Sequence, residues 1–287
     1  MNALLRLVRR LATAPGFRRL TGVAPLLRLS FALRGALVRS PLRFALNELR
    51  PGDVTASYRL REGDVSIVVR HHTPDVLVLD EVFSQREYDF PPPVEDVLAD
   101  VARPLRILDL GANIGLFGAF VLTRYADASI VALEPDPANA AIHARAIEAN
   151  ANAESWTLVQ AAAATAPGTL PFSPGDFTLS HAAEPGGGAI EVPAEDVLPR
   201  MTDADLVKID VEGGEWALLA DPRFGETGAR AVVLEYHPEN CPGPDPQREA
   251  ERALTFAGFR VAQGPTKPAF GTGVLWAWRQ RHAQSRP

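Results

Sequence analysis

Carboxylate side chains stand at or near the ends of four short apolar runs, at Asp109, Glu134, Asp210 and Glu235. Each run is followed within a few residues by glycine or proline, a pattern typical of buried strands that end in tight turns. Carboxylates can accept hydrogen bonds from ribose hydroxyls, balance a cationic ligand or accept a proton during a reaction. The spacing therefore indicates a ligand site built from several strand ends.

The first of these runs leads into a glycine-containing turn that opens an apolar, helix-compatible segment. Gly111 and Gly115 are expected to let the backbone approach a bound molecule. Asn113 replaces the glycine that a dinucleotide fingerprint requires, and Asp109 would repel a pyrophosphate. A cationic ligand such as S-adenosylmethionine (SAM) suits this turn better, with Asp109, Gly111, Asn113 and Gly115 as its binding residues.

Glu134 lies about twenty residues beyond the glycine turn, where a carboxylate can bind both hydroxyls of a ribose. This position supports an adenosine ligand without distinguishing SAM from NAD. Asp136 is expected to cap the following helix, which leaves Glu134 free for the ribose.

Three further residues could carry proton transfer. Asp210 and Glu212 follow an apolar run, and two acids one residue apart project in similar directions if the chain stays extended. His237 follows the next run and could act as a general base, with Glu235 in the same region. We expect Asp210 to be the base, ahead of Glu212 and His237, and no bound metal. The alternative is that Asp210, Glu212, Glu235 or His237 bind a hard cation.

Strands that alternate with helices must position these residues. The expected strands cover 106–110, 129–133, 156–161, 205–210, 230–235, 259–263 and 273–278, with helices near 94–102, 115–125, 137–149, 213–220 and 246–257. This order predicts an α/β fold with a Rossmann-like, seven-stranded and mostly parallel sheet. The last two strands lack an intervening helix, so the last strand should be antiparallel.

The chain divides into four parts: a basic amphipathic helical arm at 1–50, a β lead-in at 51–93, the SAM-binding domain at 94–280 and a tail at 281–287. The lead-in is expected to hold strands at 54–60, 65–70 and 76–83. For the arm, three interpretations remain open: helices packed on the acidic body, a peripheral membrane contact through residues 1–47, or a transit peptide.

The charge distribution is uneven. Residues 1–47 hold nine arginines and no acid, so the remainder carries −15 against −6 for the whole chain. An acidic body argues against nucleic-acid binding. Cys241 is the only cysteine, which favours a reducing compartment, so we expect a cytoplasmic protein, at the inner membrane face if the arm binds lipid.

The sequence resembles the FkbM family of SAM-dependent methyltransferases over roughly residues 70–278. The matching motifs are Leu-Asp-Leu-Gly-Ala-Asn-Ile-Gly at 108–115, Leu-Glu-Pro at 133–135, Val-Lys-Ile-Asp-Val-Glu-Gly-Gly-Glu at 207–215 and Glu-Tyr-His-Pro at 235–238. The resemblance implies SAM as cofactor and O-methylation of a hydroxyl on a sugar, glycan or secondary metabolite. It also implies that Tyr88 and Asp75 line the cofactor site. The chain departs from the family in an insertion at 168–200, and we expect Phe177, Ser180 and His181 in that insertion to border the acceptor.

Three rival functions can be set against this expectation. A metal-assisted O-methyltransferase would use the acids and histidine as ligands. A nucleic-acid N-methyltransferase is disfavoured because Asp-Val-Glu-Gly stands where an Asn/Asp-Pro-Pro-aromatic turn would be expected. A catalytically silent, membrane-associated or scaffolding protein would keep the fold without the reaction.

Overall fold

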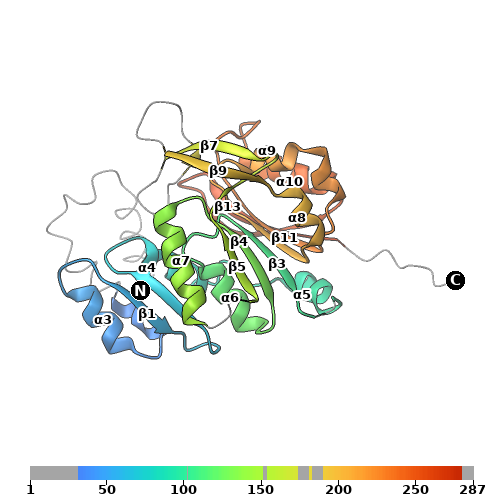
Figure 1. The fold of residues 1–287 in the computed structure, drawn as a ribbon. Helices are drawn as coiled ribbons and strands as arrows, with labels where there is room; N and C mark the ends of the chain where they lie inside the picture. The colour runs from blue at the N-terminus through green and yellow to red at the C-terminus, as the bar shows by residue number, and fades with distance from the viewer. Residues whose placement is uncertain (1–31, 102, 151–153, 174–180, 183–189, 280–287) are drawn as a thin grey trace.

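The computed structural model describes residues 32–101, 103–150, 154–173, 181–182 and 190–279 (Figure 1). A seven-stranded sheet forms its centre, in the spatial order β12-β13-β11-β10-β3-β4-β5. The strands are β3 (Arg106–Leu110), β4 (Ser129–Leu133), β5 (Trp156–Val159), β10 (Leu206–Ile209), β11 (Ala231–Tyr236), β12 (Arg260–Lys267) and β13 (Thr272–Trp278).

The direction of the strands agrees with the predicted topology. The five strands from β11 to β5 in that spatial order pair in parallel, and β13 pairs antiparallel with both β11 and β12. The predicted Rossmann-like α/β sheet with its antiparallel last strand is therefore confirmed.

Two hydrophobic cores lie on opposite faces of this sheet, because alternate strand residues point to opposite sides. One core holds Ile107, Leu206 and Val233, and the other holds Leu108, Val207 and Leu234. The first is covered by α4 (Asp75–Phe83), α5 (Pro92–Ala99), α6 (Leu116–Arg124) and α7 (Pro137–Ala149), and the second by α8 (Leu198–Asp203), α9 (Glu215–Ala220) and α10 (Pro246–Phe256).

The end of the predicted arm and the lead-in pack on the first of these cores. The arm ends with a 3-10 turn, η2 (Leu33–Leu37), and a helix, α3 (Pro41–Leu49), and the lead-in starts with the antiparallel hairpin of β1 (Thr55–Arg59) and β2 (Ser66–Arg70). Val38, Phe44 and Tyr58 share a continuous apolar cluster with the strands of the large sheet. The lead-in is therefore built into the main core.

The predicted strand at 76–83 is wrong, because these residues form the helix α4. The buried residues of α4 include Val76, Leu79, Asp80 and Phe83. Their spacing follows the turn of a helix. The high content of valine and leucine suggested a strand, but the period of the buried residues decides the structure.

The segment between β5 and α8 adds a small second sheet that the sequence did not predict. Its order is β6-β9-β7-β8, formed by β6 (Ala162–Ala164), β7 (Gly168–Ser173), β8 (His181–Ala182) and β9 (Ile190–Asp196). Of the residues expected to border the acceptor, Phe177 and Ser180 lie outside the described residues, as does the arm up to residue 31. In the described part of the chain, no helix is long and apolar enough to cross a membrane.

Candidate active site

The predicted site residues meet at one edge of the sheet, where the carboxyl ends of its parallel strands lie side by side. Asp210 N donates to Leu110 O at 3.1 Å, and the N–H groups of Gly111 and Ala112 both donate to Leu133 O. These bonds join the turn after β3 to the ends of β4 and β10. The loops that carry Asp109, Glu134 and Asp210 are thus hydrogen-bonded neighbours.

Lys208 occupies the centre of this edge, and its role was missed from the sequence. Its Nζ donates to Gly111 O at 2.9 Å and lies 3.1 Å from Asp210 Oδ2 and 3.5 Å from Asp109 Oδ1. Burial on its own would lower the pKa of Lys208. The negative charges of Asp210 and Asp109 have the larger effect, so the pKa is raised above its ordinary value. The signal in the sequence was a lysine inside an otherwise apolar strand, since a buried charge needs partners.

The packing of the protein itself requires glycine at both loop positions, in addition to the close approach of a ligand that the sequence predicts. A Cβ at Gly111 would lie 1.7 Å from Asp210 O, and one at Gly115 would lie 2.6 Å from the His143 ring. Both have positive φ, +74° and +86°. Glycine at these positions allows the turn to lie against β10 and α7.

Contrary to the expectation, the Glu134 carboxylate is not free, because both of its oxygens accept hydrogen bonds from the backbone. Its Oε2 accepts from Asn113 N at 2.7 Å and its Oε1 from Asp136 N at 2.9 Å. Asp136 does cap α7, by accepting from the N–H groups of Ala138 and Asn139. Burial raises the pKa of Glu134 to about 7. Each carboxylate oxygen retains lone-pair capacity for one further donor.

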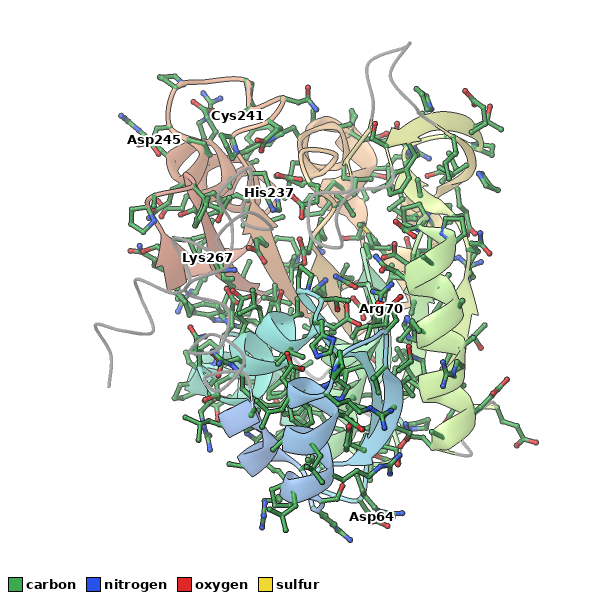
Figure 2. The ribbon with its side chains drawn as sticks, turned by 90° about the vertical axis from the view of Figure 1, so that its left-hand side faces the viewer. Asp64, Arg70, His237, Cys241, Asp245 and Lys267 are labelled. Atoms are coloured by element: carbon green, nitrogen blue, oxygen red, sulfur yellow. The ribbon has the colours of Figure 1, made fainter. Side chains whose placement is uncertain are left out.

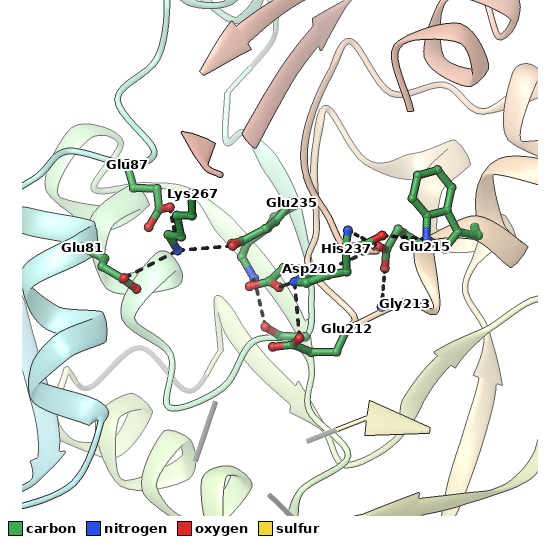
Figure 3. A network of polar contacts seen from close by, with 12 residues as sticks. Glu81, Glu87, Asp210, Glu212, Gly213, Glu215, Glu235, His237 and Lys267 are labelled. Atoms are coloured by element: carbon green, nitrogen blue, oxygen red, sulfur yellow. Dashed lines mark hydrogen bonds and ion pairs between the residues drawn. The ribbon is translucent and has the colours of Figure 1, made fainter. Parts of the chain in front are cut away.

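The side chains of Asp210, Glu212 and His237 lie close together as predicted, but the backbone that brings them together differs from the one expected. The chain does not stay extended, because β10 ends at Ile209 and Glu212 has a left-handed φ of +48°. His237 Nε2 nevertheless lies 3.3 Å from Glu212 Oε2 and 3.8 Å from Asp210 Oδ1 (Figure 3). The side chains of Asp210 and Glu212 are 23% and 31% exposed, so both can be reached from outside.

Glu215 fixes the orientation of His237. Its Oε1 accepts from His237 N at 2.8 Å and lies 3.2 Å from His237 Nδ1, while its Oε2 accepts from Gly213 N. Trp216 Nε1 donates to His237 O. Burial on its own would lower the pKa of His237. The three carboxylates of Glu215, Glu212 and Asp210 have the larger effect and raise the pKa to about 10.

The two acids next to His237 respond to different neighbours. Burial raises the pKa of Glu212 to about 8, against the opposing charge of His237. Burial also acts to raise the pKa of Asp210, but Lys208 and His237 overcome it, so that pKa is lowered. Asp210 is thus held as a carboxylate between two cations.

Tyr88 lies beside this edge, as predicted. It is 5% exposed, its ring packs edge-on against Phe117 at 5.2 Å, and Lys208 Nζ is 5.9 Å from the ring centroid. Its hydroxyl donates to Glu235 Oε2 at 3.4 Å. Asp75, in contrast, forms a bidentate pair with Arg70, which also donates to Asn139 on α7.

Glu235 turns away from His237 and belongs to a second charged group, the Lys267 cluster (Figure 3). Lys267 Nζ lies 3.0 Å from Glu87, 3.3 Å from Glu235 and 3.5 Å from Glu81. Figure 2 shows Lys267 and His237 on the same side of the molecule, above Arg70. The cluster joins the lead-in to the final hairpin next to the site.

The residues at this edge fit SAM. Asp109 is fully buried, and apart from the ion pair with Lys208 at 3.5 Å neither of its carboxylate oxygens has a hydrogen-bond partner within the described structure. Acceptor capacity of this kind suits a ligand that brings N–H groups, as the amino group of SAM does. Burial also raises the pKa of Asp109. Asp109 and Glu134 would hold the cofactor, with the backbone of the turn at 111–115.

Comparison with protein families matches residues 109–261 to the Methyltransferase FkbM domain. A curated relative, the methyltransferase sdnD of Sordaria araneosa, is 28% identical over 225 residues, which cover 64% of this chain and 81% of that protein.

Among solved structures, the methyltransferase FkbM of Methylobacillus flagellatus is 13% identical with a TM-score of 0.46. The alignment covers 71% of this chain and 54% of that one, so the chain spans about half the length of that protein. The magnesium protoporphyrin IX methyltransferase of Synechocystis with bound SAM is 16% identical with a TM-score of 0.42, over 71% of this chain and 84% of that one. The family match alone covers more than half of the sequence, so this protein belongs to the FkbM family of SAM-dependent methyltransferases.

Proposed function

We propose that this methyltransferase transfers the methyl group to a hydroxyl of a small molecule, such as a sugar, a glycan or a secondary metabolite. The observation that carries the proposal is the pair of accessible carboxylates, Asp210 and Glu212, beside the turn that would hold the cofactor. A neutral hydroxyl is a weak nucleophile, so its proton must be accepted as the new bond forms. Carboxylates at this position supply that acceptor.

Asp210 is the proposed base. It lies against the glycine turn, where its backbone carbonyl faces Gly111, and Lys208 holds its Oδ2 at 3.1 Å. Bound SAM supplies an electrophilic methyl group. The chain's own contribution is to orient the hydroxyl toward Asp210, to accept its proton at a carboxylate oxygen and to exclude water.

Glu212 and His237 are assigned supporting roles. His237 is 4% exposed, and carboxylates lie near both of its ring nitrogens, so it orients Glu212 and Asp210. Glu212 is the more exposed of the two acids and is placed to hold the acceptor.

The test combines binding with turnover on candidate hydroxyl acceptors. We expect Asp210→Asn to lower kcat by roughly 10²- to 10⁴-fold, the usual contribution of a general base, while SAM affinity by calorimetry changes little. Asp127→Asn, on an exposed position, is the matched control and should behave as wild type. Unchanged kcat in Asp210→Asn would refute the assignment of the base, and tight NAD binding without SAM binding would refute the cofactor.

A second candidate is metal-assisted O-methylation. One oxygen each from Asp210 and Glu212 and one ring nitrogen of His237 lie within 4.8 Å of one another, as a bound divalent cation would require. A carboxylate on the far nitrogen of the histidine, here Glu215, is a common support for a metal ligand. Activity lost in EDTA and restored by Mg²⁺ or Mn²⁺ would favour this mechanism, whereas activity unchanged by EDTA would exclude it.

A further inference from the structure

Helix α3 has an unusual distribution of polar and apolar residues. Its buried residues are Phe44, Asn47 and Glu48, and the two polar ones face the interior. Asn47 Nδ2 donates to Tyr58 Oη at 2.6 Å, and Glu48 Oε2 lies 2.7 Å from His71 Nδ1. The interior face of this helix is therefore held by hydrogen bonds as well as by Phe44.

The opposite face of α3 carries leucines in contact with solvent. Leu42, Leu46 and Leu49 are 79%, 66% and 46% exposed, and their spacing of four and three residues places them on one side of the helix. Leu33 of η2 is also exposed, at 69%. We call Leu42, Leu46 and Leu49 the leucine stripe. Exposed leucines grouped on one helix face, unlike scattered single ones, indicate an interaction surface.

The charges around the stripe indicate what covers it. Arg43 and Arg50 are exposed, and their separation of seven residues, at 3.6 residues per turn, places both on the same flank of the stripe. Arg50 directly follows the last residue of α3, and the Arg43 guanidinium lies 5.3 Å from the ring centroid of Tyr58. Figure 1 shows α3 at the periphery of the molecule, outside β1. Leucines bordered by arginines on a surface helix suit a bilayer with negative headgroups, where the leucines enter the acyl boundary and the arginines bind phosphate.

Two other occupants fit the charges less well. Residues 1–31 carry six arginines and no acid, so their charge opposes packing beside Arg43 and Arg50 and favours the same anionic surface. A second copy packed antiparallel about a two-fold axis would bring the arginines of both stripes together.

We propose that the leucine stripe, with Arg43 and Arg50, docks this protein on the surface of an anionic phospholipid bilayer. Arg39, which precedes α3, pairs with Asp64 at 3.3 Å, and Figure 2 places Asp64 at the bottom of the view, well below His237. The contact through α3 therefore lies apart from His237 at the catalytic edge.

The experiment measures sedimentation of the full chain with vesicles of phosphatidylglycerol and phosphatidylcholine, and with phosphatidylcholine alone. We expect binding to the mixed vesicles, with little binding to the neutral ones. The double variant Leu42→Gln/Leu46→Gln should bind about 100-fold more weakly, because each of the two leucines contributes roughly tenfold when inserted. Arg43→Gln/Arg50→Gln should also weaken binding, by about fivefold for each charge removed, and more so at low salt.

Phe256→Gln is the matched control, since Phe256 is 94% exposed but stands alone on α10. It should leave vesicle binding unchanged, and circular dichroism should confirm that all variants fold. Equal binding of wild type and the double leucine variant would overturn the proposal, as would equal binding to neutral and mixed vesicles. A dimer of the wild type in light scattering that becomes a monomer in the leucine variant would instead assign the stripe to a second copy. None of these outcomes depends on the identity of the methyl acceptor.

Discussion

Gly115 and Gly258 have nearly the same backbone conformation, with φ of +86° and +87°, but different surroundings. A Cβ at Gly115 would meet the buried His143 ring, which itself packs against Trp156 at 5.3 Å, whereas nothing lies within 4 Å of a Cβ at Gly258. Alanine substitutions at these two glycines therefore separate the free-energy cost of a left-handed backbone from the cost of a steric clash.

We expect Gly258→Ala to lower the free energy of unfolding by about 1 kcal/mol, the cost of the left-handed conformation alone. Gly115→Ala should lower it by about 2 to 5 kcal/mol, because overpacking against a fixed ring adds to that cost. Urea denaturation at neutral pH measures both. Equal losses in the two variants would show that His143 yields to the added methyl group.

Glu134 gives SAM binding a predicted pH dependence. Its pKa is raised to about 7 by burial, so the carboxylate becomes protonated as the pH falls through that value and loses acceptor capacity for ribose hydroxyls. SAM affinity in calorimetry should therefore fall below about pH 7, by up to about tenfold per pH unit if only the ionised form binds.

Glu134→Gln should bind SAM more weakly and without this slope between about pH 5.5 and 8. Glu134→Ala should cost about 1.5 to 3 kcal/mol of binding free energy, the scale of hydrogen bonds to a charged group. If the Gln variant keeps the slope, another group must titrate and the role of Glu134 in the pH dependence is refuted.

Much of the candidate site could be predicted from single residues, because an acid at the end of a parallel strand must lie at the ligand-binding edge. Asp109, Glu134 and Asp210 were placed there correctly. What the sequence could not show was the partner of each side chain. Lys208 and Glu215 act through contacts across strands and loops, and such contacts depend on the register of the sheet and the geometry of the turns.

At the level of elements, the prediction failed where composition and periodicity disagreed. Residues 76–83 are rich in valine and leucine, yet they follow the helical period and form α4. The helix then carries Glu81 toward Lys267, which lies at the end of β12. A strand in its place would have presented different side chains to the site, so the error also concealed the Lys267 cluster.

The Lys267 cluster holds α4 and the final hairpin together, and Lys267→Met tests this role. Burial raises the pKa of Glu87 to about 7, and Lys267 opposes that rise, so the three carboxylates repel one another once the lysine is removed. We expect a loss of about 2 to 3 kcal/mol of unfolding free energy at about pH 8.5.

The loss should shrink at about pH 5.5, because protonation of Glu87 relieves the repulsion in the variant. Lys267→Arg keeps the charge and should remain close to wild type at both pH values. Urea denaturation at the two pH values provides the measurement. A loss that grows on acidification would contradict the proposed electrostatic origin.

At the level of the whole molecule, the end of the arm, the lead-in and the large sheet share one apolar cluster that extends from Val38 to Trp276. The sequence divided the chain at residues 50 and 93, since composition changes there, but packing across those boundaries is not visible in composition. The predicted partition follows changes in the sequence, and the shared core leads us to expect that these segments fold together.

We expect a single cooperative unfolding transition for the full chain. Tryptophan fluorescence, which reports on Trp156, Trp216, Trp276 and Trp278, should change together with far-UV circular dichroism at the same urea concentration. A separate early transition in circular dichroism would show that the lead-in unfolds independently and would contradict a shared core.

Among the described residues, the strand that completes the large sheet is also the last one along the sequence. β13 lies between β11 and β12, and it pairs with both. While the protein is being synthesised on the ribosome, the buried strand β11 has an open edge until residues 272–278 emerge. An unpaired apolar edge of this kind invites aggregation of the nascent chain. The edge of β11 therefore stays open during synthesis of the 35 residues between β11 and β13, and shielding of exposed strands in that interval would protect the nascent chain.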